Sequence, residues 1–158
     1  MAYELNVDGM TEISEMLSKL EDAAPAVAAQ ALYEGAGIMS EEIRNAAAEI
    51  RTGPGPTRES ARYATPAEKE AVLSVGAGIA KFNKNGTEVD TSVGYRNSGY
   101  IDIDGRTKPI PLIVNSINSG TSFMHKQPFV RKAAKSGGAK AMSRMQSYIE
   151  DAFGKITK

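Results

Sequence analysis

The sequence predicts a single α+β domain spanning residues 1–158, and three observations carry this prediction. A chain of 158 residues is long enough to bury one hydrophobic core. Apolar residues recur at helical spacing in its first and last thirds, whereas its centre alternates apolar and polar residues around an Asn-Gly pair. We therefore expect an N-terminal strand and two helices, a central antiparallel β-hairpin or sheet, and a C-terminal helix packed on that sheet.

The N-terminal third predicts a short strand followed by two helices. Residues 3–7 alternate apolar and polar side chains, as in a half-buried strand, and Asp8-Gly9 then turns the chain. Apolar residues recur at helical spacing over 10–20, which indicates the first helix. Pro25 suits the first turn of a second helix, which we expect to run to about Arg51.

Glycines and prolines punctuate this second helix and end it. Gly35 and Gly37 each cost ~1 kcal/mol relative to alanine inside a helix, so they indicate a bend or a close backbone contact. The run Gly-Pro-Gly-Pro at 53–56 ends the helix. Residues 53–67 are rich in Gly, Pro, Ser and Arg, and we expect a flexible loop there.

The centre of the chain predicts β structure. Asn85-Gly86 supplies both left-handed residues of a type I′ turn, which pairs Phe82 with Val89 and Gly78 with Val93. The expected strands are 71–82 and 88–96. Residues 100–105 form another short alternating piece that ends in a turn. Residues 110–114 are apolar, but the prolines at 109 and 111 confine the start of this segment to a sheet edge or a loop.

A final helix is expected to open at Pro128. Its apolar residues form one stripe, which Gly137-Gly138 could divide in two. The stripe comprises Val130, Ala134, Ala141, Met145, Tyr148 and Ala152, widened by Met142, Ile149 and Phe153.

Residue types needed for catalysis are scarce. The chain has no cysteine, which excludes disulfides, thiolate metal sites and cysteine nucleophiles. His125 is the only histidine, and we interpret it as an ordinary exposed residue of a polar turn. The glycines at 76 and 78 begin a dinucleotide fingerprint, but Lys81 stands at its third glycine position. We expect no catalytic, cofactor-binding or metal-binding residues, no enzyme activity, and no membrane-spanning segment.

Charge is distributed unevenly although the net charge is zero. Residues 1–79 carry 13 acids and 6 bases (net −7), and residues 80–158 carry 6 acids and 13 bases (net +7). Three readings stay open: contact with nucleic acid, attraction between unlike ends of neighbouring copies, or two solvated faces that meet inside one fold. The candidates for inter-subunit or phosphate contacts are Lys126, Lys132, Lys135, Lys140 and Arg144.

The most distinctive stretch runs from Ser119 to Ala133. It reads Ser-Gly-Thr-Ser-Phe-Met, then, after two residues, Gln-Pro-Phe-Val-Arg-Lys-Ala. Gly120 can turn the chain out of a strand, and Thr121 or Ser122 can satisfy loose backbone groups. The proline fixes the helix entry, and Phe129 can anchor that end in the core. The motif residues are Gly120, Thr121, Ser122, Gln127, Pro128, Phe129, Arg131 and Ala133.

This stretch resembles the small tail-completion, or neck, family of long-tailed bacteriophages (siphophages) and their prophages. The resemblance implies a structural protein of the virion, located at the head–tail junction and assembled in the cytoplasm of the bacterial host. It implies a homo-oligomeric ring whose partners are other neck, head-closure and tail-terminator or tail-tube proteins. The main alternative is a DNA-binding accessory or packaging protein that uses the basic C-terminal helix. A small enzyme would require His125 in a closed pocket.

Overall fold

The computed structural model describes the chain except for residues 1–9, 58–59, 79–80, 83–88 and 97–98. The strand predicted at 3–7 and the turn predicted at Asn85-Gly86 lie outside the described residues. The class is α+β. Among the described residues, no helix is both long enough and apolar enough to cross a membrane.

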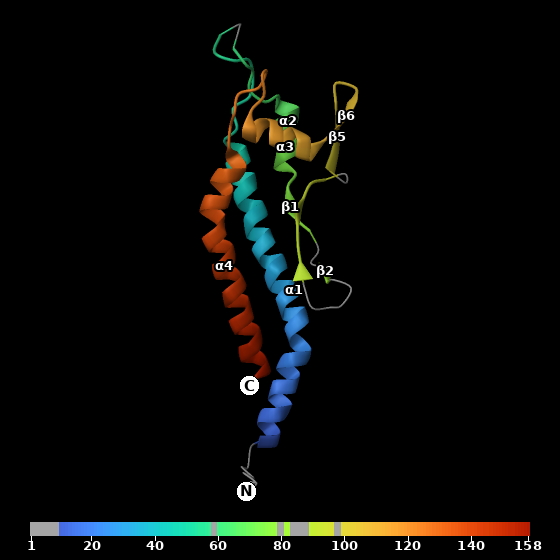
Figure 1. Cartoon of the computed structure of the whole chain (residues 1–158), viewed down its shortest axis with the longest axis vertical. Helices are drawn as coiled ribbons and strands as arrows, with labels where there is room; N and C mark the ends of the chain where they lie inside the picture. The colour runs from blue at the N-terminus through green and yellow to red at the C-terminus, as the bar shows by residue number, and fades with distance from the viewer. Residues whose placement is uncertain (1–9, 58–59, 79–80, 83–88, 97–98) are drawn as a thin grey trace.

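Two long antiparallel helices, α1 (Met10–Ala48) and α4 (Phe129–Ile156), form the body of the molecule (Figure 1). The prediction that the C-terminal helix packs on a sheet is therefore wrong: α4 packs against α1. Small residues allow the two backbones to approach. An ideal Cβ on Gly137 would lie 2.8 Å from Glu42 Cγ, and one on Gly35 would lie 2.8 Å from Met145 Sδ. Of the two glycines predicted to mark a bend or a close backbone contact, the backbone of Gly35 lies against the side chain of Met145, whereas a Cβ on Gly37 would meet nothing within 4 Å. Gly137-Gly138 does not divide α4.

The two helices predicted before residue 51 are one continuous helix, with Pro25 inside it. A proline removes one helical hydrogen bond and crowds the preceding turn. Pro25 is exposed, and the helix continues on both sides of it. At 39 residues α1 is longer than α4 at 28, so its N-terminal turns extend beyond the end of α4 (Figure 1). Leu17 lies on this extension and is 60% exposed.

Helix α2 (Pro66–Leu73) occupies the start of the strand predicted at 71–82. A capping box opens it: the Glu68 backbone N–H donates to Thr65 Oγ1, and the Thr65 N–H donates to the Glu68 carboxylate. Pro66 follows the cap, where its missing N–H has no helical partner to lose. The sequence carries this signal as Thr-Pro-Ala-Glu at 65–68.

The central strands are short and paired in twos. β2 (Lys81–Phe82) pairs with β3 (Val89–Asp90), which confirms the predicted Phe82–Val89 pair. β1 (Gly76–Ala77) pairs with β4 (Val93–Gly94), but Val93 faces Ala77 rather than Gly78.

The predicted alternating piece at 100–105 is the first half of a hairpin. β5 (Tyr100–Ile103) pairs with β6 (Arg106–Pro109) around Asp104 and Gly105, which have φ values of 52° and 73°. Residues 110–114, predicted as an edge or a loop, instead open helix α3 (Ile110–Ser119). Pro111 lies in its first turn, where a proline costs no hydrogen bond.

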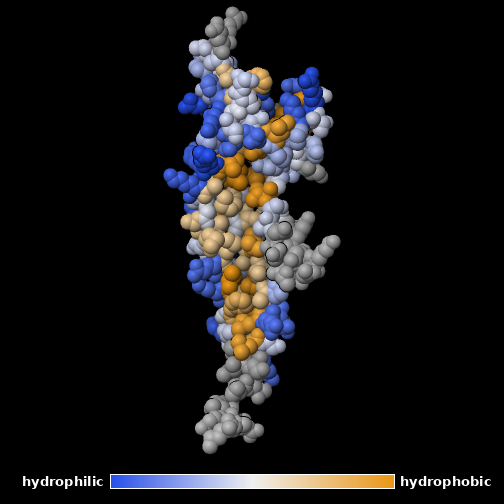
Figure 2. All heavy atoms as spheres, in the orientation of Figure 1, coloured by the Kyte–Doolittle hydropathy of each residue, from blue (hydrophilic) through white to orange (hydrophobic). Residues whose placement is uncertain are grey.

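The core is concentrated where α2, α3 and the start of α4 cap the C-terminal end of α1 (Figure 1). Apolar surface also runs along the visible face of the helix pair (Figure 2). The predicted stripe of α4 is only partly correct, because Ala134 and Met142 are exposed. The buried residues of α4 follow a four-residue spacing instead: Phe129, Ala133, Gly137 and Ala141.

Candidate functional site

The distinctive stretch of sequence links α3 to α4 beside the C-terminal end of α1. We call this region the joint, defined as residues 120–129 with residues 50–53 and 60–65. Gly120 ends α3 with φ 77°, and its N–H donates to the Ser116 carbonyl at 2.9 Å. A Cβ there would lie 3.1 Å from the Lys126 nitrogen. Gly120 therefore turns the chain out of a helix, not out of a strand as predicted.

A tight turn follows Gly120. The Thr121 N–H donates to the Met124 carbonyl at 3.0 Å, and Thr121 Oγ1 accepts from the N–H groups of Phe123 (3.3 Å) and Met124 (3.1 Å). The predicted role of Thr121 in satisfying backbone groups is confirmed. Ser122 is exposed on the turn. Met124 is buried whereas Phe123 is 73% exposed, so this turn holds adjacent apolar side chains in opposite environments.

The turn is tied to the loop that follows α1. The Arg62 N–H donates to the Phe123 carbonyl at 2.9 Å, and the His125 N–H donates to the Arg62 carbonyl at 2.8 Å. The imidazole of His125 stacks on Tyr63, with ring centroids 4.9 Å apart. Its Nε2 is buried, and no described residue hydrogen bonds to it. The prediction of an ordinary exposed histidine is therefore wrong, because Tyr63 stacks on the ring and Nε2 is buried.

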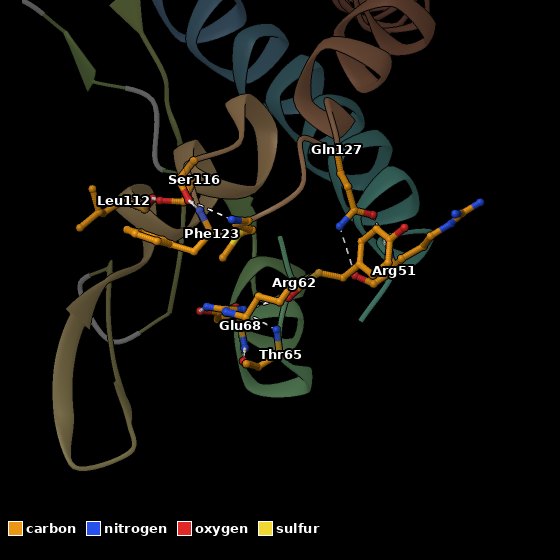
Figure 3. Close-up of polar contacts among 11 residues, drawn as sticks. Arg51, Arg62, Thr65, Glu68, Leu112, Ser116, Phe123 and Gln127 are labelled. Carbon is orange, nitrogen blue, oxygen red and sulfur yellow. Dashed lines mark hydrogen bonds and ion pairs between the residues drawn. The ribbon is translucent and has the colours of Figure 1, made fainter. Parts of the chain in front are cut away.

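Gln127 joins three parts of the joint. Its carboxamide accepts from the Arg51 N–H at 2.8 Å and donates to the Arg51 carbonyl at 3.1 Å (Figure 3). Its own N–H donates to the Ile117 carbonyl at 2.7 Å. One residue thus ties the segment before α4 to the end of α1 and to α3. The sequence singled out Gln127 but contained no indication of its partners.

Helix α4 begins at Phe129, and Pro128, predicted in its first turn, is the N-cap residue just before it. Phe129 is 4% exposed and belongs to the core cluster, which confirms its predicted position in the core. Ala133, one turn later, is fully buried. The N–H of Val130 is capped by Asn118 Oδ1 at 3.2 Å, whereas Arg131 points into solvent.

An ion pair between Arg62 and Glu68, which the sequence did not predict, braces the loop. Both terminal nitrogens of the Arg62 guanidinium donate to the Glu68 carboxylate at 2.9 Å, and the Thr65 N–H donates to the same carboxylate (Figure 3). Burial alone would raise the pKa of Glu68. The hydrogen bonds from Arg62 and Thr65, with the charges of Arg62 and Lys108, outweigh it and hold that pKa below its ordinary value. The capping-box sequence at 65–68 predicts half of this network; Arg62 has no local signal.

Three of the five candidate bases pair with acids of α1. Lys132 pairs with Glu49, Lys140 with Glu42 at 2.6 Å, and Arg144 with Glu34 at 2.9 Å. The hydrogen bonds from Arg144 and Lys140 lower the pKa of Glu34 and Glu42, respectively. These contacts favour the third reading of the charge asymmetry, in which unlike faces meet inside one fold.

The other bases of this region have no such partner in the part of the chain that the structure describes. Lys126, Arg131 and Lys135 are exposed and make no ion pair with a described residue. These three bases lie in the first turns of α4 and in the turn before it.

A pocket of about 190 Å³ opens where α1 ends and α4 begins. Its walls are mostly apolar, and Glu49 and Lys132 stand at its edge; the lining residues are Ala46, Glu49, Ile50, Gln127, Pro128, Phe129 and Lys132. Among the described residues, no three His, Cys, Asp or Glu side chains converge as metal ligands would. The joint is made of backbone hydrogen bonds and packed side chains, an arrangement suited to holding elements in place.

Comparisons with protein-family models, with curated proteins and with solved structures find no match to this chain.

Proposed function

We propose that this chain is a structural protein of a phage virion that acts at the head–tail junction, in the neck or in tail completion. In this role it assembles into an oligomeric ring that joins head-closure proteins to the tail. The observation that carries the proposal is the use made of the motif: Gly120, Gln127 and Phe129 all connect elements of the fold. The residues of the motif that resembles the neck family hold elements of the fold together. We expect such a structural role in a protein that joins other proteins.

The shape of the molecule also supports this proposal. Helices α1 and α4 form a long pair, and α2 and α3 lie at one end of it, which we call the cap (Figure 1). At 1.5 Å per residue, the 39 residues of α1 span roughly 60 Å. Long subunits standing side by side can contact one set of partners at the cap and another at the free end of α1.

Deletion of the gene in the phage or prophage that encodes it tests the proposal. We expect electron microscopy of the lysate to show filled heads and separate or unstable tails. Supplying the wild-type chain in trans should restore joined particles, and so should a Ser122→Ala chain, because Ser122 is exposed. Joined, infectious particles without any copy of the chain would overturn the proposal.

A DNA-binding accessory or packaging protein is the second candidate, favoured by the exposed Lys126, Arg131 and Lys135. The ion pairs of Lys132, Lys140 and Arg144 weaken it, since those bases already neutralise carboxylates. Fluorescence anisotropy with a labelled duplex separates the candidates. DNA binding through several phosphates falls steeply with added salt, and Lys135→Ala should reduce that salt dependence.

A further inference from the structure

The cap exposes an apolar pair that the fold does not use. Phe123 is 73% exposed, the most exposed large apolar side chain among the described residues, and Leu112 is 58% exposed. Both extend toward the same side of the cap (Figure 3). We call this pair the knob. Aromatic side chains of this kind are typical anchors of protein interfaces.

Hydrogen bonds hold the backbone of Phe123 in place. Thr121 Oγ1 accepts from the N–H of Phe123, and the Phe123 carbonyl accepts from Arg62 at 2.9 Å. The next residue, Met124, is buried at 6% exposure. Both backbone groups of Phe123 are therefore held by hydrogen bonds, so binding of a partner does not have to order the backbone at this position.

The pocket beside α4 matches an aromatic ring in chemistry and size. Ala46, Ile50 and Phe129 are buried side chains that line it. Its volume is about 190 Å³. A cavity of roughly 150 Å³ lined by apolar side chains is large enough to hold benzene.

The knob and the pocket lie on different sides of the same end of the molecule. In Figure 3, Phe123 and Leu112 extend to the left of the joint, whereas Gln127, which lines the pocket, meets Arg51 on the right. One copy can therefore offer its knob to a neighbour on one side and its pocket to a neighbour on the other. Such a head-to-tail contact produces a ring when the rotation between copies closes.

We propose that Phe123 of one copy inserts into the pocket between α1 and α4 of the next copy. The inference rests on the proposed function, because it names the contact that builds the ring. At the edge of the pocket Glu49 and Lys132 of the same chain already form an ion pair, so the contact rests on the apolar fit of the ring and not on charge.

Thiol cross-linking tests the contact directly, since the natural chain has no cysteine. Ser122→Cys places a thiol beside the knob, and Lys132→Cys places one at the pocket edge. A short bismaleimide should join the two variants to each other when they are mixed. Each variant alone should give few dimers, because two knobs or two pockets do not meet in a head-to-tail contact.

The role of Phe123 is tested in the same system. Phe123→Ala in the Ser122→Cys chain should abolish the mixed cross-link and weaken self-association in sedimentation velocity by at least about tenfold. Tyr100→Ala is the matched control, since Tyr100 is an aromatic residue 53% exposed on the β5–β6 hairpin. It should leave both measurements unchanged. Urea unfolding of each variant verifies that the fold is intact.

Three results would overturn the contact: a wild-type chain that stays monomeric at every concentration tested, Ser122→Cys alone cross-linking as well as the mixture, or Phe123→Ala associating like wild type. None of these results tests the head–tail assignment, which the deletion experiment tests separately. Unjoined particles there, together with a failed cross-link, would mean that the ring uses another surface.

Discussion

The carboxamide of Gln127 bonds both backbone groups of Arg51, 76 residues earlier in the chain, accepting at 2.8 Å and donating at 3.1 Å. The first residues after α1 are thereby held against the segment that opens α4. The two hydrogen bonds resemble those between paired residues of neighbouring β-strands, with the carboxamide of Gln127 in place of the second backbone.

Gln127→Ala should lower the free energy of unfolding by about 1–2 kcal/mol, because two partly solvated backbone groups lose their partners. Gln127→Glu keeps the acceptor and the shape but loses the donor, so it should also destabilise the protein. Urea unfolding followed by circular dichroism measures both changes. A stability equal to wild type in Gln127→Ala would show that the two bonds contribute nothing.

Two phenylalanines in the same segment should differ sharply. Phe129 is 4% exposed, so Phe129→Ala should cost roughly 3–5 kcal/mol, the usual range for a buried phenylalanine. Phe123 is 73% exposed, so Phe123→Ala should change the stability of the monomer by no more than about 0.5 kcal/mol. Urea midpoints at low protein concentration compare them. Equal losses would contradict the assignment of one ring to the core and the other to the surface.

Glu68→Gln should destabilise the protein by about 1.5–3 kcal/mol at neutral pH, because it removes a charge-assisted pair while keeping the shape. The folded-state pKa of Glu68 lies below its ordinary value of 4.5. Its charge therefore contributes stability above the unfolded-state pKa, and that contribution is lost as pH falls through the folded-state pKa.

The difference between wild type and Glu68→Gln should accordingly shrink on acidification. Urea unfolding over a series from about pH 7 to about pH 2 follows it. Glu70→Gln is the control, because Glu70 is 71% exposed and lies 3.5 Å from Arg96. It should have little effect at any pH. A difference for Glu68→Gln that is independent of pH would exclude its charge as the cause.

Adjacent glycines of α4 provide a test of the helix pair. A Cβ on Gly137 would lie 2.8 Å from Glu42 Cγ and 3.1 Å from Met39 Sδ, whereas one on Gly138 would meet nothing within 4 Å. Gly138→Ala should stabilise the protein by up to ~1 kcal/mol through helix propensity. Gly137→Ala should be less stable than Gly138→Ala by about 1–3 kcal/mol, because overpacking opposes the same gain. Thermal unfolding ranks them, and equal stability would contradict the close approach of α1 and α4.

Local signals in the sequence determined several elements. Asn85-Gly86 and its flanking residues predicted the Phe82–Val89 pair, and Pro128 marked the start of the last helix. These features depend on neighbours in the chain, where turn chemistry and proline geometry act. The capping box at Thr65 and Glu68 is equally local, so the sequence also carries the signal for helix α2, part of which lies in the strand predicted at 71–82.

The tertiary structure alone decided what depends on partners distant in sequence. Pro25 looked like a helix start, but it lies within α1, and a single lost hydrogen bond does not end a helix of 39 residues. The basic residues of α4 looked available to a partner, but Lys140 and Arg144 face Glu42 and Glu34 of α1. The spacing of charged and apolar residues specifies a helix face, but it does not specify which other element covers that face. Helices α1 and α4 are 80 residues apart in the chain, and small residues between them let them pack together. This packing decides which helix faces are covered.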